Sequence, residues 1–542
     1  MDPVTRTLAR WMAAPPLWMG RQLHRWVTGA QAVLEVPVGP IADLAERQAW
    51  LLRLGRVAAD PHVAAVVLRI DGPLGGWAAH EDLRGVVGEL RRAGKTVVAQ
   101  LQTPGNASLW VAAACTRSVI VPTGEVALVG IGAELTFFGA LLERVGVQPD
   151  FEAAGAYKSF GEPWTRRYAS PANLEATRTL VDSLHERLVA DLAHDRNLSR
   201  EQVIACIERA PLSAADAVAS GLVDQLAYPD QLQESLLEQY GADDPVPFGA
   251  WARRDLLLER LSRVGGPTER VVVLHLDGPI GMEAGSSGMG AVQVIPHLED
   301  LREDSSVAGV VLHVSSPGGS AIASDRMWRE VDLLRRAKPV VACFEDVAAS
   351  GGYYLSAPAQ HIIARRTTLT GSIGVFGGKL VMADGLRQVG VHHQQVLAGP
   401  NAAMFSPSEP FNPSQRARFR ESLQRFYDGF VERVASGRGQ SEDDIEPHCR
   451  GRVWTGELAK DRGLVDRFGG VPEAVARVRE LAACPRAQRV DRSFRPPWQG
   501  LFRQGLRHVL PAAAVAPVSG AMWMAAHAGE PLAMWPFELK VR

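Results

Sequence analysis

Apolar residues occur along the chain in short runs, separated by longer stretches of mixed apolar and polar residues. The runs are rich in Val, Ile and Leu, which suit buried strands, and several end in a turn with Gly or Pro. The longer stretches repeat apolar residues at helical spacing, as between Ser324 and Ala337. This alternation predicts the α/β class, with a parallel sheet and crossover helices. The clearest strand candidates are residues 33–38, 63–68, 95–99, 273–276, 307–312 and 340–344.

The apolar runs of the first half return in the second half at an offset of roughly 240–244 residues. A period of this size is that of a domain and not of a stacked short repeat. Because 542 residues are too many for one hydrophobic core, the chain is predicted to be a tandem duplication. The matching segments are 33–41 with 273–280, 63–68 with 307–312, 95–99 with 338–342, and 221–224 with 463–466.

The duplication divides the chain into five predicted parts. Two related domains, 33–245 and 271–484, are joined by a linker at 246–270. A basic segment that contains Trp residues, 1–32, precedes them, and a basic tail rich in Ala and Pro, 485–542, follows them. Each predicted domain has a size that can fold around its own core.

The composition is that of a globular protein without an evident nucleic-acid partner. Hydrophobic residues make up 46% of the chain and charged residues 22%, which excludes a largely disordered chain. The 58 basic and 60 acidic residues nearly cancel, so the whole chain has no electrostatic preference for nucleic acid. The five cysteines are far apart without a C-x-x-C, and the fourteen histidines include no H-E-x-x-H. We therefore predict no disulfide framework, no metal site and no cofactor.

The two ends of the chain carry an excess of positive charge. Residues 1–34 contain four Arg and one Asp, residues 485–529 contain six Arg and one Asp, and both segments also contain Trp. This pattern suits a segment in the membrane interface, and it equally suits a surface helix that packs on its own domain. The uncharged stretch 509–529 contains Pro and Gly and is a poor membrane-spanning sequence. The prediction is peripheral membrane contact through the termini, without a transmembrane helix.

Ser350 is the first candidate for chemistry. It follows the predicted strand 340–344 and lies among small residues that let a strand turn sharply into a helix. Such a turn leaves a hydroxyl accessible and brings the N–H groups of a helix N-terminus near an oxyanion. The G-x-S-x-G motif is absent because Ala348 occupies its first glycine position. An ordinary helix N-cap would have the same sequence, so that interpretation stays open.

Two consecutive glycines, Gly318 and Gly319, follow the preceding strand candidate. Glycines let a carbonyl approach backbone N–H groups closely, as an oxyanion hole requires, although a plain turn has the same composition. A Gly-Gly turn after one strand and a Ser-Gly-Gly segment after the next are less common together than either is alone. The combination favours acyl chemistry at this edge of the sheet.

A base for Ser350 must be sought elsewhere in the chain. His361 opens the strand-like segment 361–364 and is expected to lie a strand length from the hydroxyl. Lys158 is flanked by aromatic and small residues. It can act as a base if burial lowers its pKa and keeps the amine neutral, whereas a solvated lysine is the simpler interpretation.

The repeat links these two candidates. In the alignment of the halves, Ala402 stands opposite Lys158 and Ala107 stands opposite Ser350. One half therefore retains the base and the other the nucleophile, which is expected if one active site is assembled from both halves. The alternative is that the losses are incidental and that Ser108, one position away, reflects a slip in the alignment.

Together these segments resemble the signal peptide peptidase A (protease IV) family in its long tandem-domain form, over roughly residues 30–480. The resemblance implies a crotonase/Clp-protease-like fold for each domain, with Ser350 as nucleophile and Lys158 as general base. It also implies an oxyanion hole formed by the N–H groups of Gly318, Gly319 and Gly351. The most specific matches are 315–320, 348–354, 369–374, 157–159 and 162–163.

The resemblance further implies a homotetramer that cleaves peptides, such as signal-peptide remnants, at the bacterial inner membrane. The long members of the family have an apolar N-terminal anchor, whereas residues 1–34 here contain Pro and Arg. The expected function is that of a serine endopeptidase with a Ser/Lys dyad. Two other functions stay open. One is a crotonase-type acyl-CoA hydratase or isomerase with Glu345 and Asp346 as its carboxylates, and the other is an inactive membrane scaffold.

Overall fold

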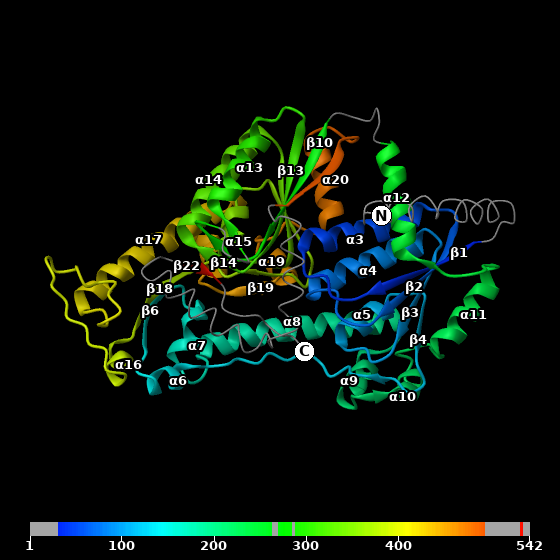
Figure 1. Cartoon of the computed structure of the whole chain (residues 1–542), viewed down its shortest axis with the longest axis horizontal. Coiled ribbons are helices and arrows are strands. Elements are labelled where there is room, and N and C mark those ends of the chain that lie inside the picture. The colour runs from blue at the N-terminus through cyan, green and yellow to red at the C-terminus, as the bar shows by residue number, and fades with distance from the viewer. Residues whose placement is uncertain (1–30, 263–268, 284–287, 494–531, 535–542) are drawn as a thin grey trace, which may run out of the picture.

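The computed structural model describes residues 31–262, 269–283, 288–493 and 532–534. Two halves lie side by side, and each is built around its own parallel sheet with helices on its faces (Figure 1). The predicted α/β class and the tandem arrangement of two such units are therefore confirmed.

The N-terminal half contains a six-stranded parallel sheet. One face is covered by α3 (Leu44–Arg56), α4 (Trp77–Arg92), α5 (Asn106–Ala113) and α8 (Pro171–Arg196), and the other by α11 (Pro229–Tyr240). Because both faces are covered, the central strands carry nearly continuous apolar residues. The strand order is β8 (Gln225–Leu226), β4 (Arg117–Ile120), β3 (Thr96–Leu101), β2 (Val63–Ile70), β1 (Ala32–Val38) and β9 (Val246–Pro247).

The C-terminal half repeats this plan with an eight-stranded sheet. One face packs against α13 (Ala291–Glu303), α14 (Ala321–Ala337) and α17 (Pro413–Arg438), and the other against α20 (Val471–Leu481). All its pairs are parallel except that of β17 with β19. The order is β19 (Val453–Thr455), β17 (Leu369–Gly371), β15 (Val340–Ala349), β13 (Val307–Ser316), β10 (Arg270–Asp277) and β21 (Gln488–Ser493), with β16 (His361–Ala364) beside β15 and β20 (Arg467–Phe468) beside β16.

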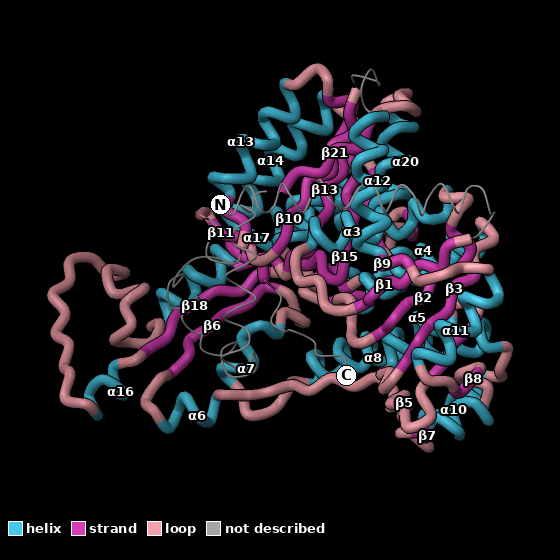
Figure 2. Tube along the Cα trace, turned by 45° about the vertical axis from the view of Figure 1, so that its right-hand side comes forward, coloured by secondary structure: helices cyan, strands magenta, loops and turns pink. Residues whose placement is uncertain are grey.

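A third sheet joins the two halves. β6 (Gln148–Ala154) pairs antiparallel with β18 (Val375–Val381), and Figure 2 shows these two strands side by side. β22 (Leu532–Met534) then pairs antiparallel with β18 and with β14 (Gly318–Ser320). β11 (Ile280–Gly281) and β12 (Met289–Gly290) complete the sheet. Since β6 comes from the N-terminal half and β18 from the C-terminal half, this sheet fixes the two halves relative to each other.

α8 strengthens the same junction from below (Figure 1). Ser170 caps its first turn by accepting from the N–H of Asn173, and Pro171 occupies the first helical turn. Farther along, Leu180 packs with Ala349 and Leu369 of the C-terminal sheet. α8 therefore supports the ends of β15 and β17 directly.

The remaining elements are mostly short, apart from α12. They are β5 (Glu125–Val126), α6 (Gly139–Arg144), α7 (Glu162–Thr165), α9 (Arg200–Glu208), β7 (Leu212–Ser213), α10 (Ala214–Ala219), α12 (Phe248–Ser262), α15 (Gly351–Ser356), α16 (Ala383–Gln388), α18 (Glu442–Ile445) and α19 (Gly456–Asp461). The five cysteines are free thiols, and four of them are buried.

In the part of the chain that the structure describes, no helix combines the length and the apolar character needed to cross a membrane. The basic segments predicted to contact a membrane, 1–32 and 485–542, lie mostly outside the described residues. Within the predicted tail, residues 488–493 form β21 and extend the C-terminal sheet beside β10.

Candidate active site

Ser350 stands at a sharp turn between β15 and α15. Its backbone has φ 54° and ψ −114°, a conformation that residues other than glycine rarely adopt. Its N–H donates to the carbonyl of Gly371 (2.8 Å), and its carbonyl accepts from the N–H of Tyr354 (2.8 Å). The strand, the turn and the helix therefore hold a buried hydroxyl in a strained position, as nucleophile turns do.

A glycine after Ser350 lets α15 approach the neighbouring strand closely. A Cβ atom on Gly352 would lie 2.9 Å from the carbonyl oxygen of Ser316, at the end of β13. Ala348, which replaces the first glycine of the G-x-S-x-G motif, lies inside β15 opposite Ser316 and is buried. The sharp turn thus forms without that glycine.

Lys158 reaches Ser350 from the other half of the same chain. It follows β6, and its loop rests on the turn before β19, where Tyr157 N–H donates to the carbonyl of Arg450 (2.8 Å). A Cβ atom on Gly451 would lie 2.6 Å from the backbone nitrogen of Lys158. This close packing places Lys158 Nζ 2.8 Å from Ser350 Oγ.

Burial lowers the pKa of the Lys158 amine well below its ordinary value. The side chain is only slightly exposed. A neutral amine has two N–H donors and one lone pair. The N–H groups have two acceptors in Ser372, its carbonyl oxygen and its Oγ, each 3.0 Å away. The lone pair is then left for the hydroxyl proton of Ser350.

Ser372 is a site residue that the sequence reasoning did not assign. It follows Gly371 at the end of β17 and has φ 51°, and its N–H donates to the carbonyl of Arg452 (2.7 Å). The signal available in the sequence was the segment Leu369–Gly374, in which serine is flanked by Gly371 and Ile373. That signal is weak, because half of the contact with Lys158 uses a backbone oxygen.

Comparison with known proteins places this site in a family. The family model described as "Peptidase family S49" matches residues 89–243 and 332–484, one region in each half and together more than half of the chain. The chain belongs to peptidase family S49. The two matched regions also agree with the duplication that the sequence predicts.

Two S49 relatives show how far the similarity extends. The chain is 30% identical to "Serine protease SPPA, chloroplastic" of Arabidopsis thaliana over 80% of its own length, and 32% identical to "Protease 4" of Salmonella typhi over 73%. It spans 65% of the length of each of these relatives. A solved ClpP1 mutant from Listeria monocytogenes aligns with 40% of this chain and 99% of its own, at 16% identity and a TM-score of 0.26.

The predicted oxyanion glycines lie around Ser350 in this S49 site. Gly351 opens α15, and β14, which contacts α15, contains Gly318 and Gly319. A Cβ atom on Gly319 would lie 2.0 Å from the carbonyl oxygen of Ile280, so glycine is required there. The N–H of Gly318 donates to Ser316 Oγ (3.1 Å). The oxyanion role of the three glycines remains a prediction.

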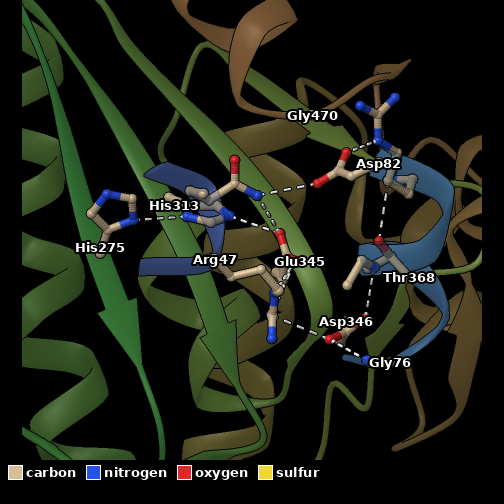
Figure 3. A network of polar contacts seen from close by, with 12 residues as sticks. Arg47, Gly76, Asp82, His275, His313, Glu345, Asp346, Thr368 and Gly470 are labelled. Carbon is tan, nitrogen blue, oxygen red and sulfur yellow. Dashed lines mark hydrogen bonds and ion pairs between the residues drawn. The ribbon is translucent and has the colours of Figure 1, made fainter. Parts of the chain in front are cut away.

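The other candidates of the sequence lie away from the dyad or are engaged elsewhere. His361 pairs in register with Val341, at the opposite end of β15 from Ser350. Glu345 and Asp346 form hydrogen bonds with the N-terminal half (Figure 3). In the N-terminal half, Gly105 is the N-cap residue of α5 as Ser350 is of α15, so the helix starts set Gly105 opposite Ser350 and not Ala107, as the sequence alignment predicts. Among the described residues, no group of His, Cys, Asp and Glu side chains is placed to hold a metal ion.

Proposed function

We propose that the chain is a serine endopeptidase in which Ser350 is the nucleophile and Lys158 the general base. The observation that carries this proposal is the buried contact of 2.8 Å between Lys158 Nζ and Ser350 Oγ. A neutral lysine within hydrogen-bond distance of a serine hydroxyl can remove its proton during attack. The names of the two S49 relatives, both of them proteases, support the same activity.

The proposed reaction is acyl transfer in two stages. Lys158 accepts the hydroxyl proton while Ser350 Oγ bonds to the carbonyl carbon of the peptide. The N–H groups of Gly318, Gly319 and Gly351 stabilise the oxyanion. For this, the hydrogen bond from the N–H of Gly318 to Ser316 Oγ must break. Protonated Lys158 then gives its proton to the leaving amine. In the second stage Lys158 deprotonates a water molecule, which hydrolyses the ester and frees Ser350.

The proposed substrates are peptides with apolar sequence near a membrane, such as signal-peptide remnants. The resemblance to signal peptide peptidase A supports this class. The basic, Trp-bearing ends support peripheral attachment to a bacterial inner membrane, where such peptides remain. Flotation of the full chain with anionic and with neutral vesicles tests the attachment, and we expect binding to the anionic vesicles only.

We also propose that the chain assembles as a homotetramer. α6 and α16 lie together at one end of the molecule (Figure 1), where the N–H of Gly385 in α16 donates to the carbonyl of Gly146 in the turn after α6 (2.9 Å). Apolar side chains are exposed on this end, which we call the arm. Clustered exposed apolar residues are typical of association surfaces. The exposed residues of the arm are Leu141, Val145, Val389, Val391, Val396 and Leu397.

The test of the activity compares the wild type with Ser350→Ala and Lys158→Met on casein and on apolar fluorogenic peptides. We expect both variants to lose hydrolysis, and only chains with Ser350 to react with a fluorophosphonate. Full hydrolysis by either variant would refute the dyad. If both variants are inactive in hydrolysis yet replace the wild type in cells, the scaffold function is correct instead.

The hydratase alternative is not favoured. It needs carboxylates that face a thioester, and Glu345 is buried against Arg47 while Asp346 accepts from the N–H groups of Gly76 and Ala79. Stoichiometric binding of an acyl-CoA to the purified chain would restore that alternative.

A further inference from the structure

The strand that carries Ser350 is irregular just before the turn. Phe344 of β15 lies opposite Val314 of β13, but Ala348 lies opposite Ser316, so β15 uses four residue steps where β13 uses two. Glu345 and Asp346 lie in this bulge. A bulge interrupts the hydrogen bonds of the sheet, and its position must be fixed by other contacts.

Glu345 fixes the bulge to α3 of the other half. Its Oε1 accepts from Arg47 Nε (3.3 Å) and Nη2 (3.0 Å), and its Oε2 accepts from Gln48 Nε2 (3.2 Å). Its Oε2 also lies 2.9 Å from Nε2 of His313 in β13. Figure 3 shows these side chains converging on Glu345. Arg47 also pairs with Asp346 Oδ2 (3.4 Å), so this one buried cation holds both carboxylates of the bulge, and its loss would leave the buried Glu345 without a cationic partner.

Asp346 fixes the bulge to the first turn of α4. Its Oδ2 accepts from the N–H of Gly76 (2.9 Å), and its Oδ1 accepts from the N–H of Ala79 (3.1 Å). Gly76, the N-cap residue of α4, has no side chain of its own to do this. A Cβ atom on Gly76 would lie 2.5 Å from Asp346 Cγ. Asp346 is therefore a helix cap supplied by the other half of the molecule.

The next turn of α4 holds the segment that leads to Ser372. Glu81 accepts from the N–H of Arg366 (3.2 Å), and from the N–H (3.0 Å) and the Oγ1 (2.8 Å) of Thr367. Its neighbour Asp82 forms an ion pair with Arg365. This segment enters β17 directly, and β17 ends just before Ser372. The first two turns of α4 thus contact the approaches to Ser350 and to Ser372.

We propose that Asp346 and Glu81 are positioning residues that hold Ser350 and Ser372 at the distances that the Lys158 amine requires. The proposal rests on the proposed function. The dyad combines residues from two halves, so its geometry depends on contacts that cross the junction, and Asp346 and Glu81 supply such contacts from opposite sides. A misplacement of about 1 Å in a reacting group can cost on the order of 100-fold in rate.

The test measures, as a function of pH, the rate at which a fluorophosphonate labels Ser350 in four variants: Asp346→Ala, Asp346→Asn, Glu81→Ala and Glu81→Gln. The melting temperature of each variant is measured as well. We expect the two Ala variants to label about 10-fold to 100-fold more slowly. The pH at which labelling reaches half its maximum should rise, because a wider gap admits water to Lys158 and favours its charged form. Asn and Gln, which keep one acceptor oxygen, should recover part of the rate.

Asp332→Asn is the matched control. Asp332 is buried and pairs with Arg329, Arg335 and Arg336, but all four residues lie in α14 and do not join the halves. We expect this variant to lower the melting temperature without changing the labelling rate or its pH dependence. If Asp346→Ala fails to fold, Asp346→Asn and Glu81→Gln decide the question.

Two results would overturn the proposal. One is that the folded Asp346 and Glu81 variants are labelled at the same rate as the wild type and with the same pH dependence. The other is a loss of rate that follows the melting temperature equally in Asp332→Asn. A wild type that neither labels nor hydrolyses peptides would refute the proposed function itself, so the two failures are distinguishable.

Discussion

At the scale of single residues, the proposed mechanism makes the amine of Lys158 the group that determines how the activity depends on pH. Only the neutral amine can accept the proton of Ser350, and burial lowers its pKa well below the ordinary value. We therefore expect kcat/KM to rise with pH through this depressed pKa and to level off above it. The measurement is a pH-rate profile on a fluorogenic peptide, repeated with a chelator that we expect to have no effect. A profile that falls with rising pH in the same range would contradict a lysine base.

The same pKa shift predicts how stability depends on pH. In the unfolded chain Lys158 has an ordinary pKa of about 10.4 and is charged at neutral pH, whereas burial in the folded chain lowers its pKa well below that value and favours the neutral amine. The unfolded state thus binds one more proton, and the stability of the wild type gains with rising pH up to about pH 10. Lys158→Met lacks this contribution. We expect its stability relative to the wild type to decrease between about pH 7 and pH 9.5 in denaturant titrations, while a constant difference would show a charged lysine.

The backbone of Ser350 supplies a third prediction. Its φ of 54° costs a residue with a Cβ atom about 1–3 kcal/mol, and glycine avoids most of that cost. Both Ser350→Gly and Ser350→Ala are expected to be inactive. In urea unfolding, the free energy of unfolding of Ser350→Gly should exceed that of Ser350→Ala by about 1 kcal/mol. At Ser356, the last residue of α15, the same pair of substitutions should give the opposite order, because glycine weakens a helix.

The residues of the site show what the sequence could predict and what it could not. Ser350 and Lys158 were found because each lies in a distinctive segment and because the repeat has lost each in the other half. Ser372 was missed because its contribution depends on a backbone oxygen set by a φ of 51°. Glu345 and Asp346 were considered as carboxylates for chemistry, since the sequence does not show that Arg47 and α4 bind them.

At the scale of elements, the parallel sheets were predictable and the sheet between the halves was not. β1, β2, β3, β10, β13 and β15 lie where the apolar runs predict strands, because strands buried on both faces must be apolar. β6 and β18 pair although they lie far apart in the sequence, in different halves of the chain, and no local pattern specifies such a partner. β21 has a polar, charged sequence although most of its residues are half-buried, so the sequence does not distinguish these six residues from the rest of the tail.

β22 leads to the fourth prediction. This strand of the C-terminal tail pairs with β14, which contains two of the predicted oxyanion glycines, and with β18. A peptide bound in extended form beside Ser350 would need the same edge of β14, so β22 is expected to compete with it. Ala533→Pro removes a backbone N–H from β22 and should weaken this pairing.

We expect Ala533→Pro to lower KM for fluorogenic peptides by about 2-fold to 10-fold, the effect of one or two backbone hydrogen bonds. The catalytic constant at saturating peptide should stay unchanged, because the dyad is untouched. Ala533→Ser, which keeps the N–H, is the control and should behave as the wild type. A higher KM in the proline variant would mean that β22 assists peptide binding.

At the scale of the whole molecule, the dyad is complete within one chain. Lys158 and Ser350 meet through β6, β18 and α8, which all belong to the same polypeptide. The repeat predicts a site that both halves share, but the sequence alone does not show whether the halves come from one chain or from two. The structure places them in one chain, so assembly of further copies is not needed to bring the two residues together.

Because Lys158 and Ser350 meet within one chain, assembly through the arm can be tested independently of the dyad, which gives the last prediction. Val396 is 95% exposed on the arm, and a charge there would be costly to bury between copies of the chain. We expect Val396→Asp to reduce the mass measured by light scattering to that of a smaller assembly, with fluorophosphonate labelling of Ser350 retained. Val129→Asp, at an exposed site shortly after β5, should keep the wild-type mass, because β5 lies away from α6 and α16 (Figure 2). An unchanged mass in Val396→Asp would exclude the arm as the interface, and a loss of labelling would mean that assembly supports the dyad after all.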